Sequence, residues 1–133
     1  LDPIEIFRDS ARRLEAKKEH LPSDLQPHLE GIRQATDRIL LCMRTDPEDV
    51  ASGERFLARY LSAAHKLVDE HVRLFQEGGG YKNVQEALQS SGALLARLEQ
   101  ACIDEHCDLL RNDTMNFTAE IHVLDTLLKT QGK

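Results

Sequence analysis

A chain of 133 residues is short enough for one domain, and its 41% hydrophobic and 30% charged residues exclude wholesale disorder. The net charge of -6 disfavours non-specific binding to nucleic acid or anionic lipid. Only 5% of the residues are aromatic, which favours a leucine- and alanine-filled helical core over a sheet.

The cysteine content and the hydropathy indicate the cellular compartment of the protein. Three cysteines are an odd, sparse set, typical of a reducing cytoplasm. No apolar run approaches the ~20 residues of a membrane span. Because the chain opens with Leu-Asp-Pro, we expect it to be the soluble C-terminal part of a longer protein.

Helical periodicity begins at the N-terminus. A first helix is expected to end near residue 19, with Ile4, Phe7, Ala11 and Leu14 on one face. Ser23 and Gln26 are expected to form a capping box for a second helix, which ends near Arg44. Its apolar face advances in steps of four and three residues: Leu25, Leu29, Ile32, Thr36, Ile39 and Met43.

The third helix has the clearest start signal. Asp46 is expected to be its N-cap and Pro47 its first residue, with acidic residues 48 and 49 at the positive end of the helix dipole. It should run to about Gln76 and end in the glycines at 78–80. Its apolar face comprises Val50, Leu57, Tyr60, Ala64, Leu67, His71 and Leu74, widened by Phe56, Leu61, Val68 and Phe75.

Two helices are expected after the glycines. Asn83 with Glu86 should cap the fourth helix, whose apolar face carries Val84, Leu88, Leu95, Leu98, Cys102 and Leu109. The polar stretch 111–116 should end it, and a last helix should carry Phe117, Ile121, Leu124 and Leu128 and stop at Gly132. The sequence thus predicts a single all-α domain over residues 1–133. Three long helices form an antiparallel bundle, and the shorter N- and C-terminal helices lie along it or across its ends.

Two stretches resemble a known family. They are "ERFLARYLSAAHKLVDEHVRL" (54–74), preceded by "RTDPED" (44–49), and the closing "EIHVLDTLLKTQG" (120–132). In this order they resemble the helical domain of XpaC-like proteins, the 5-bromo-4-chloroindolyl phosphate hydrolysis family, over residues 32–132. The resemblance also implies a relation to TelA-like toxic-anion-resistance proteins. This chain has Ala63-Ala64-His65-Lys66-Leu67 where the family pattern has Thr-Thr-Lys-Leu.

The resemblance implies a link to phosphate esters but no established catalytic residues. Relatives often carry N-terminal hydrophobic helices. The resemblance therefore implies a cytoplasmic domain, with a preceding segment as its tether to the inner face of the membrane.

Two motifs contain metal-ligating residue types. In "CIDEHC" (102–107), Cys102 and His106 are four residues apart, but the second ligand pair of a tetrahedral zinc site is missing, so Cys102 is better explained as a core residue. In "HKLVDEH" (65–71) the histidines are six residues apart and point in different directions, and His65 is expected to pair with Asp69 on the surface. We predict no metal and no cofactor.

Phosphatase signatures are also missing from the sequence. No cysteine begins a Cys-x5-Arg loop, the triple glycine lacks the lysine of a phosphate-binding loop, and no aspartate cluster suits a two-metal site. In the last helix, Glu120, His122 and Asp125 do not converge and are interpreted as a solvated face. We therefore predict no catalytic residues.

A basic patch near the start is the one candidate interaction surface. It consists of Arg12, Arg13, Lys17 and Lys18. It is either a solvated face or a contact for an anionic membrane surface or an acidic partner. The leading hypothesis is a non-enzymatic helical domain that binds a protein partner or self-associates and does not bind nucleic acid. The alternative is a hydrolase, or a hydrolase accessory, that acts on phosphate esters.

Overall fold

The computed structural model describes residues 2–133 and confirms an all-α fold, with no strand in that range. α1 (Pro3–Ala16) continues into a short 3-10 turn at Lys17–His20 and is followed by α2 (Gln26–Thr45). A second 3-10 turn at Pro47–Asp49 leads into α3 (Val50–Gly78). α4 (Lys82–Leu109) and α5 (Arg111–Thr130) complete the chain.

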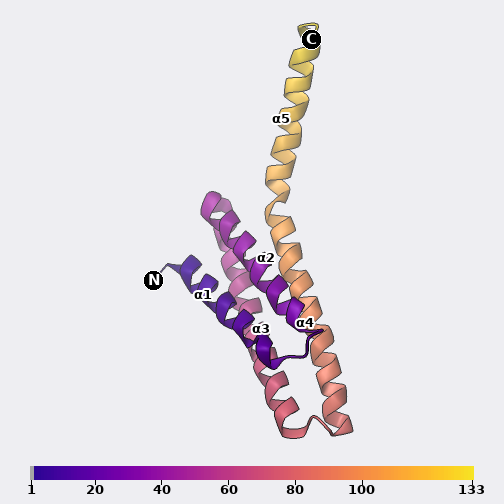
Figure 1. The fold of residues 1–133 in the computed structure, drawn as a ribbon. Coiled ribbons are helices and arrows are strands. Elements are labelled where there is room, and N and C mark those ends of the chain that lie inside the picture. The colour runs from indigo at the N-terminus through magenta and orange to yellow at the C-terminus, as the bar shows by residue number, and fades with distance from the viewer. Residues whose placement is uncertain (1) are drawn as a thin grey trace.

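The first four helices form the body of the molecule (Figure 1). Successive helices run in opposite directions, so α2 and α4 point the same way. α2 and α4 nevertheless make the most extensive helix contact, while α1 packs against α2 and α3. This arrangement agrees with the predicted bundle of three long helices and with a shorter N-terminal helix alongside it.

The core lies between these four helices. Leu14, Leu29, Ile39 and Leu57 are completely buried in it, one or two from each of the first three helices. Leu95, Cys102 and Leu109 supply the contribution of α4. Apolar residues three and four apart share one helix face, so the sequence period identified most of this core. Phe75, which was placed on the apolar face of α3, is instead 57% exposed.

The helix starts were predicted with mixed success. The Asp46 side chain does act as a cap, because its Oδ1 accepts from the backbone N of Glu48 at 3.0 Å. The predicted caps at Ser23 and Asn83 are wrong. α2 begins after Leu25, which a turn from Pro22 already places in helical conformation, and α4 begins after an extended Tyr81, so Asn83 lies inside its first turn.

α4 ends at Leu109, directly before the polar stretch 111–116 that was expected to end it, but this stretch is itself helical and forms the start of α5. This stretch has no glycine or proline, and the backbone N of Thr114 donates to the carbonyl of Leu110 at 2.9 Å. The Thr114 hydroxyl donates to the same carbonyl at 2.9 Å. The backbone hydrogen bonds of a helix thus continue through this polar stretch. Only Leu110 separates α4 from α5.

α5 does not close the bundle, contrary to the prediction that the C-terminal helix lies along it or across its end. It continues α4 beyond the ends of the other helices and projects from the body (Figure 1). No residue from 110 to 133 is buried. The predicted stop at Gly132 is confirmed, since Gly132 has φ +71° and the N–H of Lys133 donates to the Leu128 carbonyl at 2.9 Å.

Candidate functional site

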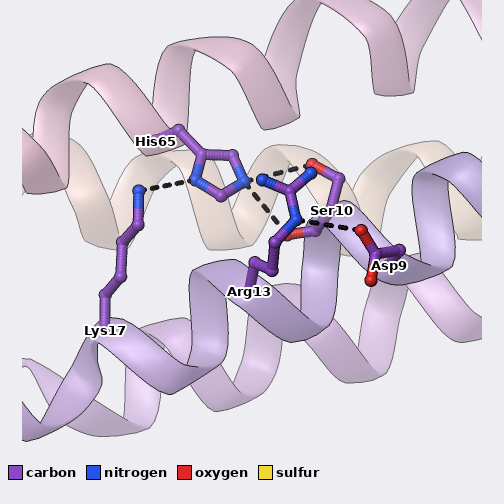
Figure 2. Close-up of polar contacts among 5 residues, drawn as sticks. All are labelled: Asp9, Ser10, Arg13, Lys17 and His65. Carbon is purple, nitrogen blue, oxygen red and sulfur yellow. Dashed lines mark hydrogen bonds and ion pairs between the residues drawn. The ribbon is translucent and has the colours of Figure 1, made fainter.

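A half-buried histidine joins α3 to α1 (Figure 2). His65 Nε2 lies 3.1 Å from the Ser10 hydroxyl and 3.0 Å from the Ser10 carbonyl. On the other side of the ring, Nδ1 lies 2.9 Å from Lys17 Nζ. Lys17 Nζ also lies 2.8 Å from Asp69 Oδ1, so the predicted surface partner of His65 binds Lys17 instead.

The hydrogen bonds of His65 determine its tautomer. The Lys17 ammonium can only donate, so Nδ1 accepts and Nε2 carries the hydrogen that points at Ser10. Burial, and then the charge of Lys17, lower the pKa of His65 and favour the neutral ring. A histidine that activates a serine must present an unprotonated nitrogen to the hydroxyl. This cluster therefore cross-links two helices and does not activate Ser10.

The basic patch is largely engaged within the domain. Arg13 Nε lies 2.9 Å from Asp9 Oδ2, and Lys18 Nζ lies 3.5 Å from Glu30 Oε1. Lys17 is held by His65 and Asp69, and Arg12 is exposed. The contacts of Lys17 lie on α3 and that of Lys18 on α2, whereas Arg12 and Arg13 are exposed. The role of the four residues in binding stays a prediction.

The cysteine–histidine motif on α4 divides between core and surface. Cys102 is buried, and burial raises the pKa of its thiol to about 12. Cys107 is exposed, and burial lowers the pKa of the half-buried His106. Within residues 2–133, no three His, Cys, Asp or Glu side chains are placed to share a metal ion. Cys102 is therefore a core residue, as its place on the predicted apolar face of the fourth helix indicated.

One carboxylate at the start of α3 was expected only to complement the helix dipole. Asp49 is 7% exposed, and its Oδ2 has no hydrogen-bond partner among the described residues. Burial, and then Asp46, raise the pKa of Asp49. Burial likewise raises the pKa of Glu105 on α4, whose Oε2 accepts from the Ser52 hydroxyl at 2.9 Å.

An open groove of about 400 Å³ lies where the end of α3 and the first half of α4 meet the loop before α2. Leu25, Phe75 and Leu88 contribute to its apolar lining. His71, also in the lining, is buried, and its Nδ1 lies 3.0 Å from the Ser91 hydroxyl. Burial lowers the pKa of His71. The groove thus pairs an apolar floor with one neutral Ser–His contact, which sequence reasoning missed because the two residues lie on different helices.

The most extended apolar surface lies on α5. Phe117 is 62% exposed, and Ile121, Leu124 and Leu128 are each at least 50% exposed. The pattern continues back into α4 through Leu110 and Ile103, which are 37% and 42% exposed. We call this surface the apolar seam of α4–α5. Its members alternate in steps of four and three residues: Ile103, Cys107, Leu110, Thr114, Phe117, Ile121, Leu124 and Leu128.

Only the C-terminal half of this seam, from Phe117 to Leu128, was identified from the sequence. The polar stretch 111–116 concealed its continuity, although the alternation itself was readable across it. Glu120, His122 and Asp125 are exposed, as predicted for a solvated face, and Asp125 Oδ2 lies 2.9 Å from Lys129 Nζ. Exposed apolar surface of this extent marks an interaction site more often than a free surface.

Comparisons with known proteins identify one family. The sequence model of the 5-bromo-4-chloroindolyl phosphate hydrolysis protein matches residues 18–124, most of the chain. This confirms the family that the sequence resemblance indicated, while the relation to TelA-like proteins stays a prediction. No curated protein and no solved structure matches the chain. Within the described residues, no helix is long and apolar enough to cross a bilayer.

Proposed function

The chain belongs to the 5-bromo-4-chloroindolyl phosphate hydrolysis protein family, and we propose that this domain is a non-enzymatic protein-interaction module. The observation that carries the proposal is the apolar seam on a helix that projects from the body. A helix with an exposed apolar stripe is the usual ligand of a groove or of another amphipathic helix.

The exposed side chains are enough to support an association. Covering a half-exposed Leu, Ile or Phe is worth roughly 1 kcal/mol, about half the value for complete burial. The seam offers six such side chains: Ile103, Leu110, Phe117, Ile121, Leu124 and Leu128. Their sum of roughly 6 kcal/mol, together with what the partner contributes, is comparable to the 4–15 kcal/mol lost on association. A reversible complex is therefore expected.

Site-specific photo-crosslinking in the source cells tests this function. A photoreactive phenylalanine analogue at position 117 should form covalent adducts with protein. The same analogue at position 119, on the opposite side of α5, is the matched control. Equal adduct yields at the two positions would overturn the proposal.

The proposal also covers the basic patch and the cellular location of the domain. We place the domain in the cytoplasm, with Arg12 and its neighbours facing an anionic membrane surface when an upstream segment tethers the chain. The exposure of Arg12 and Arg13 supports this contact. Binding to anionic vesicles that is lost in Arg12→Glu/Arg13→Glu, and absent on zwitterionic vesicles, is the expected result.

Phosphate-ester hydrolysis is the second candidate, and it rests on the family description and on the His71–Ser91 pair beside the groove. Purified chain should be incubated with an indolyl phosphate, with and without added divalent metal. Turnover that survives repurification and is lost in both Ser91→Ala and His71→Gln would favour the hydrolase. The interaction module predicts no turnover above the level of these variants.

A further inference from the structure

We propose that the partner of the apolar seam is a second copy of this chain, and that two α5 helices pair antiparallel through their seams. This inference rests on the proposed function and names the partner of the same surface. It is carried by the heptad spacing of the seam, by the charges that flank it and by the direction in which α5 projects.

The spacing of the seam is that of a coiled coil. Apolar residues that alternate in steps of three and four occupy the a and d positions of a heptad repeat. Here the alternation runs from Ile103 to Leu128, about three and a half heptads, which is the length at which such a pattern favours a coiled coil. The same a and d positions on an identical helix are complementary to it, so one stripe supplies both sides of the contact.

The flanking charges favour the antiparallel orientation. In a parallel pair, the g and e positions of the two helices face each other, which sets Glu120 beside Asp125 of the second copy. An antiparallel pair centred between Phe117 and Ile121 instead sets Arg111 beside Asp125 of the second copy, and does so twice by symmetry. In this register Glu120 of one chain lies beside Glu120 of the other, which gives one repulsive contact in each dimer. Two attractive contacts against one repulsive contact favour it over the parallel pair.

The shape of the molecule suits the same arrangement. α5 is exposed along its whole length and extends beyond the other helices (Figure 1). The α1–α4 body of an antiparallel partner therefore lies near the C-terminal tip of the first α5, away from the first body. The overlap from Leu110 to Leu128 then stacks six layers on each helix without contact between the two bodies. Only the tip of the second α5 approaches Cys107, which is also exposed.

Sedimentation equilibrium of the purified full chain tests the dimer. The wild type should change from monomer to dimer as its concentration rises. Ile121→Glu/Leu124→Glu places charge in the seam and should weaken dimerisation at least 100-fold, about 2.7 kcal/mol. Ala119→Glu/Thr126→Glu adds the same charge on the outer side of α5 and should leave the dimerisation constant within about threefold. A wild type that stays monomeric at the highest soluble concentration, or a control that dissociates as readily, would overturn the inference.

A charge exchange tests the orientation. Arg111→Glu and Asp125→Arg should each weaken the dimer about tenfold, because each replaces two attractions with two repulsions. The double variant restores both pairs and should return to near the wild-type constant. Within its own chain Arg111 also lies 2.7 Å from Asp108, and Asp125 lies 2.9 Å from Lys129. Each single variant loses one of these exposed contacts and the double variant loses both, so their loss alone cannot produce a recovery in the double variant. A double variant weaker than either single variant would refute the antiparallel register.

The two proposals can fail separately. A monomer in solution whose position 117 still crosslinks to another protein in cells would leave the interaction module standing and remove the second copy as its partner. Loss of crosslinking at position 117, with dimerisation of the purified chain intact, would limit the seam to self-association outside the cell. Loss of both would overturn the module and the dimer together.

Discussion

Removal of most of α5 is expected to leave the body of the protein as stable as before. A chain that ends after Asn116 lacks Phe117–Lys133, a segment in which no residue is buried. The last core residue, Leu109, is 7% exposed and keeps two further turns of helix after it. A helix that packed on the bundle would instead lower the stability of the body when it is removed.

The magnitude follows from burial. A surface segment without buried side chains should change the free energy of unfolding by no more than ~0.5 kcal/mol. For a domain of this size that is a shift in Tm of about 1–3 °C, since 1 kcal/mol corresponds to roughly 3–5 °C. Leu57→Ala removes a completely buried side chain and provides the contrast, with an expected cost of about 2–5 kcal/mol and a fall in Tm of at least about 6 °C.

Differential scanning calorimetry at a concentration where the chain is monomeric measures both effects. Dilution matters because a dimer would add its own stability to the full chain. The far-ultraviolet signal of the full chain should also decline before the main transition, since a helix without tertiary contacts is marginal in water. If truncation lowered Tm as much as Leu57→Ala does, α5 would have to pack on the body in solution, and both the apolar seam and its proposed role would be refuted.

Two further predictions concern titration and thiol chemistry. Burial lowers the pKa of His65, so as pH falls below about 6.5 the unfolded chain takes up a proton before the folded chain does, and stability falls. Urea midpoints should therefore drop between pH 7.5 and 5.5 by less in His65→Gln than in the wild type, and equal drops would show that His65 does not titrate differently on folding. A maleimide should label Cys107 in the native chain within minutes and should reach Cys42 and Cys102 only on unfolding, as mass spectrometry of the peptides can show. Rapid native labelling of Cys102 would contradict its burial and its raised pKa.

The bundle could be predicted from the sequence because its information is local. The spacing of Leu29, Ile32 and Ile39 identified a buried face without knowledge of what covers it, and Asp46-Pro47 marks a helix start through chemistry within one turn. The caps at Ser23 and Asn83 failed because competing local geometry, a turn at Pro22 and an extended Tyr81, placed the helix starts elsewhere.

The fate of α5 could not be predicted in the same way. Its apolar stripe at Phe117 and Leu128 fits a helix that packs on its own chain and equally one that pairs with another. The choice depends on whether α1–α4 already cover the core, which is a property of the whole assembly. The Ser10–His65–Lys17 cluster was missed for a related reason, since residues 55 positions apart are brought together only by the packing of α1 on α3.

Leu110, the single residue between α4 and α5, sets the direction in which α5 projects from the body. α5 has 20 residues and therefore extends about 30 Å beyond Leu110. A change of about 10° in the backbone at that residue moves the far end of the helix by about 5 Å, comparable to one helical turn. A backbone change at Leu110 would thus shift the tip of α5 by this distance and leave the hydrophobic core below it unchanged, because no residue after Leu109 is buried.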